Sequence, residues 1–182
     1  MAEGYQMAHG STKAVAEKTK SQSSGAGKRP TSFLKTRIGV RLIPYKHVKV
    51  IGQSVGLTSN NKASIIKALK SGLPISSFEK LQKIMDVPAG ELASTVNIAP
   101  RTLSRRKKQG KLQTDESERL LRIGRLFDMA LELFEDKRLA RQWFKEPNKA
   151  LGGSSPLNYS DTEPGAKEVE MLIGRLEHGV FS

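Results

Sequence analysis

The 182-residue chain is predicted to fold as an all-α protein, because helical periodicity dominates its sequence from Lys62 onward. Apolar residues recur there every three or four positions, the spacing of helices that bury one face. A second observation supports this fold class: we find no internal repeat and no convincing sheet pattern. A third observation sets the start of the folded part, since the first 32 residues contain no Ile, Leu, Phe or Trp.

That N-terminal segment is rich in Lys, Ser, Gly and Ala. It cannot bury enough apolar surface to offset the entropy of ordering, so we expect residues 1–49 to form a disordered basic tail and an extended arm. The arm is suggested by Arg37–Gly52, where Ile38, Val40 and Leu42 alternate weakly at period two. This pattern permits a strand or an extended segment, interrupted by Pro44.

The first helix is predicted from Lys62, with Ile65, Ile66 and Leu69 on one face, and it should end at Ser71-Gly72. In the second, Ser76 with Glu79 three residues later has the pattern of a capping box. Its buried stripe comprises Phe78, Leu81, Ile84 and Met85. Pro88 should end this helix and open the next one.

Residues 89–108 have the pattern of a helix-turn-helix. Ala93 supplies the small side chain where the two helices touch, and Asn97 at the turn tolerates positive φ better than most residues. The packing positions are apolar: Leu92, Val96, Ile98 and Leu103. The second helix should begin near Pro100, and we place this bundle within residues 50–112.

Basic and hydroxyl side chains fill the second helix of this motif. Arg and Lys pair with guanine edges and phosphates, and Ser and Thr hydroxyls reach backbone oxygens, so we predict a DNA-binding face. The candidate DNA-binding residues are Arg101, Thr102, Ser104, Arg105, Arg106, Lys107 and Lys108. Arg106 and Lys111 are expected to extend phosphate contact. A solvated basic helix in an unrelated bundle is the alternative that spacing alone leaves open.

Three further helices are predicted in residues 113–182. Thr114 caps a helix of about twenty residues, with Asp115 and Glu116 in its first turn, where the helix dipole favours acidic side chains. Trp143 and Phe144 mark the core side of a second helix, which ends before Pro147. The last helix closes at Gly179. The apolar residues of these helices include Leu120, Ile123, Phe127, Phe134, Leu139, Val169, Leu172 and Ile173.

Charge divides the chain unevenly. Residues 1–49 and 50–112 each carry a net charge of +8, whereas residues 113–182 carry −3, within an overall +13. A polyanion-binding front and a back part with another task are the natural interpretation. Cysteine is absent, which excludes disulfides and zinc–thiolate sites and suits the cytoplasm. No apolar run is long enough to span a membrane.

Enzyme signatures are missing, so we expect no catalytic residues, no metal and no cofactor. The three histidines lie far apart in the sequence, and no nucleotide-binding fingerprint is present. "LGGSSPL" (Leu151–Leu157) superficially resembles a phosphate-binding loop. It lacks the terminal Lys-Ser/Thr and follows a helix rather than a strand. We therefore predict that Gly152 and Gly153 only shape a bend.

Several motifs together resemble the Xre/ParS antitoxins of bacterial toxin–antitoxin pairs whose toxins carry a RES domain. The resemblance runs from about Ile51 to Ser182. In the DNA-binding half it rests on Arg101–Arg106 and on Glu116-Ser117. In the other half it rests on Ala140-Arg141-x-Trp143, Pro147-Asn148, Leu151-Gly152-Gly153, Pro156-Leu157 and the ending from Gly165 through Val169 to Gly179.

This resemblance implies a non-catalytic antitoxin with two functional parts. One part binds operator DNA of its own promoter and represses the operon. The other binds and blocks the cognate RES-domain toxin, which consumes NAD or transfers ADP-ribose. The family also implies a homodimer within a larger toxin–antitoxin complex. The toxin-binding residues implied at the C-terminus are Arg175, Glu177, His178, Val180, Phe181 and Ser182.

Two features depart from the family pattern: the polar stretch Leu157–Ala166 and the long basic tail. From the residues alone, the tip Val180–Ser182 fits insertion into a partner and a frayed terminus equally well. Two other functions stay open at this point. One is a plain transcriptional regulator whose C-terminal domain only dimerises; the other is a protein-interaction adaptor that has lost DNA binding.

Overall fold

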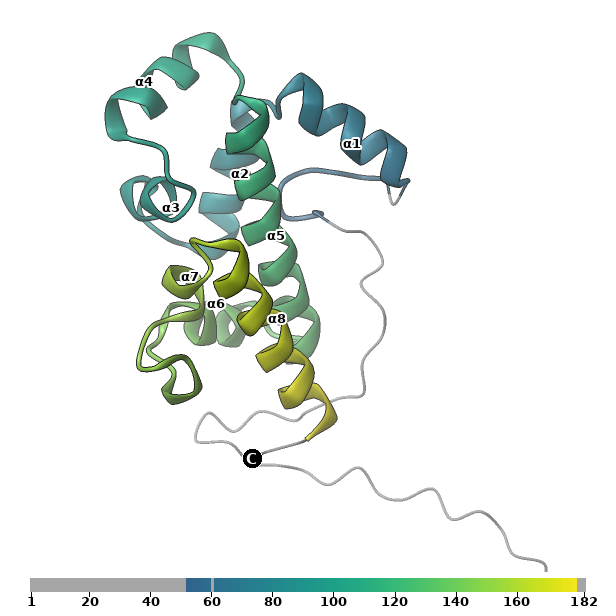
Figure 1. Ribbon diagram of the computed structural model, residues 1–182, viewed down its shortest axis with the longest axis vertical. Helices are drawn as coiled ribbons and strands as arrows, with labels where there is room; N and C mark the ends of the chain where they lie inside the picture. The colour runs from purple at the N-terminus through teal and green to yellow at the C-terminus, as the bar shows by residue number, and fades with distance from the viewer. Residues whose placement is uncertain (1–51, 60, 180–182) are drawn as a thin grey trace, which may run out of the picture. The chain divides into compact units, whose positions relative to one another are not determined.

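The computed structural model describes residues 52–59 and 61–179, all within one unit, Thr31–Ser182. The predicted tail, the arm before Gly52 and the tip Val180–Ser182 lie outside the described residues. Within them every regular element is a helix and no strand forms, so the all-α prediction is confirmed (Figure 1). The order is α1 (Lys62–Ser71), α2 (Ile75–Met85), α3 (Ala89–Thr95), α4 (Pro100–Gln109), α5 (Thr114–Phe134), α6 (Lys137–Lys145), the 3₁₀ turn η1 (Lys149–Leu151), α7 (Pro156–Tyr159) and α8 (Glu163–His178).

α1 and α2 lie where the periodicity places them, but their ends differ in detail. Gly72 ends α1 with a φ of 82°, as predicted. The capping box predicted at Ser76 is wrong: the cap position lies two residues earlier, at Pro74, and no side chain caps the helix. Pro74 is held by an isolated antiparallel bridge to Lys111, and this contact fixes the start of α2. Tertiary pairing therefore overrides the local capping signal.

The helix-turn-helix prediction is confirmed in α3 and α4. Asn97 at the turn has a φ of 54°, in the left-handed region that its short polar side chain tolerates. Ala93 is 2% exposed at the contact between the helices. α4 begins at Pro100, whose missing N–H is no loss at the first helical position. The predicted packing residues are all buried: Leu92, Val96, Ile98 and Leu103.

α5 is the longest helix and packs on both sides of the fold. It contacts α1 and α2 as well as α6 and α8, so one hydrophobic core continues along it (Figure 1). Its start differs from the prediction, because Gln113 rather than Thr114 occupies the cap position. The backbone N–H of Gln113 donates to the Glu116 carboxylate at 2.8 Å. Glu116 therefore contributes the acidic half of a capping box, whereas Thr114 is the first helical residue.

Aromatic side chains form the core between α5 and α6. Phe127 and Phe144 meet edge to face with ring centroids 5.5 Å apart, and Trp143 packs against Phe134 at 5.7 Å. Trp143 and Phe144 are 6% and 0% exposed, which confirms that they belong to the core. Asp136 caps α6 by accepting hydrogen bonds from the backbone N–H groups of Arg138 and Leu139.

The stretch between α6 and α8 contains a 3₁₀ turn and a short helix that the periodicity does not predict. α7 begins at Pro156, where the Ser155 hydroxyl accepts from the Asn158 N–H. Leu157 is fully buried, so this polar stretch still contributes one anchor to the core. The predicted division between residues 112 and 113 remains a prediction.

Candidate functional site

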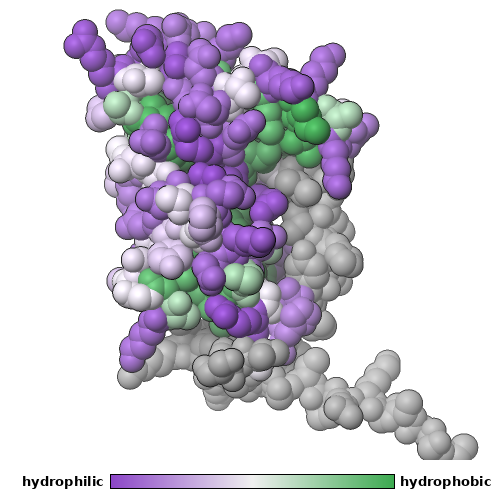
Figure 2. Space-filling view, viewed as in Figure 1, coloured by the Kyte–Doolittle hydropathy of each residue, from purple (hydrophilic) through white to green (hydrophobic). Residues whose placement is uncertain are grey.

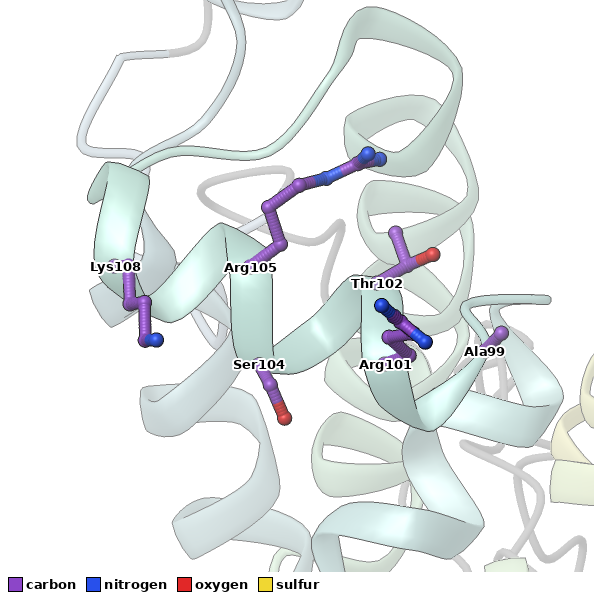
Figure 3. A pocket seen from close by; sticks show the side chains of 6 residues that line it. All are labelled: Ala99, Arg101, Thr102, Ser104, Arg105 and Lys108. Atoms are coloured by element: carbon purple, nitrogen blue, oxygen red, sulfur yellow. The ribbon is translucent and has the colours of Figure 1, made fainter.

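The outer side of α4 presents most of the predicted DNA-binding residues together. Arg101, Ser104, Arg105, Lys107 and Lys108 are exposed, and Thr102 is half-buried. An open hollow of about 560 Å³ runs along this helix. Figure 3 shows five of these side chains around it, with Ser104 and Lys108 projecting to one side of α4 and Arg105 to another. The remaining lining residue is Ala99.

The start of α4 adds backbone donors to this surface. Ala99 at the cap position has no side-chain acceptor for the first N–H groups of the helix. Among the described residues, nothing accepts a hydrogen bond from the N–H of Arg101 or Thr102. Unpaired N–H groups at a helix start favour anions, because the helix dipole is positive there. The start of α4 therefore offers unpaired donors of the kind that favour an anion.

The predicted phosphate contact of Arg106 is wrong. Its side chain is buried, and its Nε donates to both Glu116 carboxylate oxygens at 3.0 and 2.8 Å. Nη1 also donates to Gln109 Oε1 at 2.8 Å. α4 turns this residue toward α5, so it is not available to a phosphate. It instead fixes α4 on α5, while exposed Lys111 stays a predicted phosphate contact.

Glu116 and Ser117 thus have a structural role at the α4–α5 junction. The Ser117 hydroxyl accepts from the Leu73 N–H at 2.8 Å and donates to the Gln113 carbonyl at 2.7 Å. Together these contacts join the loop before α2, the end of α4 and the start of α5. A sequence signal was present, since Arg106 and Glu116-Ser117 were both family landmarks, but their pairing is a tertiary property.

The last turns of α8 carry three of the predicted toxin-binding residues. Arg175 and His178 are exposed and Glu177 is half-buried. Gly179 ends the helix with a φ of 66°, where its N–H donates to the Arg175 carbonyl. The other three predicted residues, Val180, Phe181 and Ser182, lie outside the described residues. The structure therefore brings half of this predicted site to one helix end.

The inner side of α8 is fixed against α5. Val169 and Ile173 are buried, and two ion pairs flank them: Arg122 Nη1 to Glu163 Oε2 at 2.8 Å and Arg125 Nη2 to Glu170 Oε2 at 2.6 Å. These pairs were not predicted, because residues about forty positions apart in sequence form them. They lie beside the apolar contacts that hold this side of α8 on α5.

A second unpredicted link joins α6 to the end of α2. Arg141 donates from Nε to the Ile84 carbonyl at 2.6 Å and from Nη2 to the Lys83 carbonyl at 3.1 Å. Lys145 Nζ donates to the Asp86 carbonyl at 3.1 Å. Cations at a helix C-terminus satisfy its last carbonyls and complement its dipole. The helix with the aromatic core residues therefore caps a helix of the DNA-binding half.

Asp128 on α5 holds the described segment before α1. Its carboxylate accepts from the Ser54 N–H at 3.1 Å, and the Ser54 hydroxyl donates to the Gly124 carbonyl at 3.0 Å. Burial raises the pKa of Asp128 to about 6, although the hydrogen bonds from Ser54 work in the opposite direction. Gly124 has no Cβ, which leaves room for Val55 against the helix.

The loop Leu151–Leu157 is a bend, as predicted. Gly152 and Gly153 have φ values of 64° and 87°, and a Cβ on either would meet no neighbour, so glycine is needed for backbone angle alone. The N–H of Gly152 donates to Lys149 and that of Gly153 to Asn148. These internal bonds leave neither donor for a phosphate.

Neither a metal site nor a membrane span is found in the described part of the chain. Among residues 52–59 and 61–179 no group of three or more His, Cys, Asp or Glu side chains is placed to hold a metal ion. Over the same residues, none of the helices has the length and apolar character needed to cross a membrane.

The fold and the surface of α4 define this chain as a helix-turn-helix protein with an appended helical domain. Comparison with known proteins identifies the family of both parts. Residues 64–125 match the antitoxin Xre-like helix-turn-helix domain, and residues 129–179 match the antitoxin Xre/MbcA/ParS C-terminal toxin-binding domain. The two matches meet inside α5.

Individual relatives agree with these matches. The antitoxin Xre of Yersinia enterocolitica is 36% identical over 141 residues, 76% of this chain and 95% of the relative. That of Photorhabdus laumondii is 39% identical over 132 residues, 71% and 89% of the two chains. A Prs ADP-ribosylating antitoxin of Sphingobium sp. is 25% identical over 127 residues, 64% and 80%. The chain belongs to the Xre/MbcA/ParS antitoxin family.

Proposed function

We propose that this chain neutralises a RES-domain toxin through its C-terminal half and represses its own operon through α4. The observation that carries the proposal is the division of exposed surfaces. Cationic and hydroxyl side chains line α4, whereas the end of α8, in the part matched as toxin-binding, carries Arg175 and His178. On this proposal the chain is a non-catalytic binding protein that acts in the cytoplasm.

The DNA contact follows the usual geometry of the motif. The second helix of a helix-turn-helix lies in the major groove, with its N-terminal residues at the base edges. Arg101 and Thr102 occupy that end of α4, and Arg105 lies one turn further on. Arg105, Lys107 and Lys108 then pair with bases or phosphates. Because such motifs read two half-sites as dimers, the proposal includes a homodimer on operator DNA of its own promoter.

The toxin contact is proposed at the end of α8 and the residues after it. Arg175, Glu177 and His178 approach the toxin, and Val180, Phe181 and Ser182 enter its active-site cleft. A RES toxin consumes NAD or transfers ADP-ribose, and the name of the Sphingobium relative refers to ADP-ribosylation. That name supports ADP-ribose chemistry in the toxin partner.

Two variants separate the two activities. Arg105→Ala should weaken binding to a promoter fragment about tenfold or more, because a lost base or phosphate pairing costs about 1–3 kcal/mol. It should also lower the slope of log affinity against log salt by about one. Toxin neutralisation should stay intact, measured as growth when the proposed cognate RES-domain toxin is co-expressed.

Deletion of Val180–Ser182 should do the reverse. Promoter binding should be unchanged, while growth and cellular NAD level fall on co-expression. A truncated chain that neutralises fully would contradict the role of the tip. Wild-type chain that binds promoter and random DNA equally weakly at all salt concentrations would contradict the DNA-binding role, since phosphate contacts weaken steeply as salt rises.

A further inference from the structure

The outer face of α8 has no partner within the described chain. We use this name for six residues that recur at helical spacing opposite the buried side: Lys167, Glu168, Met171, Gly174, Arg175 and His178. All are exposed except Gly174, which is half-buried. Among the described residues, none forms an ion pair or a side-chain hydrogen bond with Lys167 or Arg175.

Met171 lies at the centre of this face and is 45% exposed. Among the described residues it is one of two large hydrophobic side chains in the open, the other being Ile66 on α1 at 51%. Figure 2 shows the hydrophobic patch over α1 on a face that is otherwise mostly hydrophilic. The Met171 side chain is a flexible thioether, and Lys167 and Arg175 lie one turn to either side of it. Such an arrangement suits an apolar pocket with an acidic rim.

Gly174, one turn from Met171, is not explained by packing inside the chain. A Cβ at Gly124 would press on Val55 and one at Gly165 on the Tyr159 carbonyl, so those two glycines are required internally. A Cβ at Gly174 would meet nothing within 4 Å. Glycine within a helix destabilises it relative to alanine, because the unfolded chain loses more freedom on folding. A partner lying close against the helix would account for glycine there.

We propose that the outer face of α8 docks on the toxin, with Met171 inserted into an apolar pocket and Gly174 admitting close approach of the toxin surface. The inference rests on the proposed function and extends it from the C-terminal tip to the whole helix. The toxin is the occupant because α8 lies in the part matched as the toxin-binding domain, and because this face includes Arg175 and His178, which the proposed function already assigns to the toxin contact. Its opposite side is occupied by α5.

The experiment measures the affinity of the full-length chain for its purified cognate toxin, which is a RES-domain protein on the proposed function. Met171→Ala should weaken binding about tenfold or more, as expected for an interface anchor. Gly174→Ala should also weaken it about tenfold, and Gly174→Leu should weaken it further. Both glycine variants should melt higher, by about 2–4 °C, because they favour the helix. A weaker complex from a more stable protein is not the result of misfolding.

The chain offers matched controls in its other half. Ile66→Ala removes the other exposed hydrophobic side chain, and Gly90→Ala, at an exposed position of α3, fills a site where a Cβ also meets nothing. Neither should change toxin affinity more than twofold.

Three outcomes would overturn the inference. Wild-type chain that fails to bind the RES-domain protein would remove the proposed function and this inference together. Wild-type affinity in Met171→Ala and Gly174→Leu would remove the inference alone. If Met171→Ala dissociates an oligomer of this chain in sedimentation while toxin affinity is unchanged, the face binds a second copy and the proposal is wrong.

Discussion

α4 and α8 both present a functional face outward, but they are held on the fold by different forces. α4 buries one apolar side chain, Leu103, and one charged side chain, Arg106. α8 buries Ala166, Val169, Leu172 and Ile173, and its ion pairs are more exposed. The Arg106 and Glu116 side chains are 9% and 6% exposed, whereas Arg125 and Glu170 are each 40% exposed. The position of α4 therefore depends on a buried charge pair, and that of α8 on apolar burial.

The largest effect is expected at Arg106. Arg106→Met should lower the free energy of unfolding by about 3–5 kcal/mol, because it leaves Glu116 buried without its partner. Operator affinity should fall with it as α4 loses its attachment to α5. Urea denaturation, with the midpoint and slope fitted together, measures the loss.

The double variant Arg106→Met/Glu116→Gln is the control for this interpretation. Gln keeps an acceptor for the Gln113 N–H but removes the buried charge, so more than half of the lost stability should return. A single variant that loses less than about 1 kcal/mol would show that the pair is solvated like a surface pair and would remove the contrast with α8.

Apolar burial on α8 gives the next effect. Ile173 is 1% exposed, so Ile173→Ala should cost about 2–4 kcal/mol through lost burial and the cavity left behind. The loss should be insensitive to salt, since no charge is removed. Denaturation at low and high salt checks this, and a loss that shrinks strongly as salt rises would mean that charge holds α8 in place.

Asp128 should make the attachment of the segment before α1 depend on pH. Its pKa of about 6 lies above the ordinary value of 3.8, so the folded state binds the proton more tightly than the unfolded state. As pH falls from 7 toward 5, protonation of Asp128 should therefore stabilise the fold. The stability of wild type relative to Asp128→Asn should rise over this range, as followed by thermal or urea unfolding at both pH values. A constant difference would contradict the raised pKa.

The smallest effect is expected at Glu170. Its pair with Arg125 is accessible to water, so Glu170→Gln should cost less than about 1 kcal/mol, and less still at high salt. Thermal melts in low and high salt provide the test. A loss approaching that of Arg106→Met would mean that the two helices are held in the same way.

The sequence was sufficient to predict the elements whose causes are local. Asn97 at the turn, Ala93 at the helix contact and the glycines that end α1 and α8 each carry a backbone or packing preference in their own residue type. Apolar periodicity then oriented the helices. The outward side chains of α4 followed from the same periodicity, because a residue that does not face the core faces solvent.

What the sequence missed depends on contacts between distant residues. Arg106 was predicted to extend phosphate contact, but Glu116, ten residues on and across a turn, supplies the opposite charge with which it is buried. Pro74 starts α2 because Lys111 pairs with it, and Arg141 caps α2 from 57 residues away. α7 is only four residues long, too short for a periodic signal.

The central claim is that DNA binding and toxin binding occupy separate helices of one fold. The direct measurement is a pair of titrations of the Arg105→Ala and Met171→Ala variants, one with operator DNA and one with the proposed RES-domain toxin. We predict that Arg105→Ala loses about tenfold or more in operator affinity with toxin affinity within twofold of wild type, and that Met171→Ala shows the reverse. Two variants that each lose both affinities in equal measure would contradict the claim.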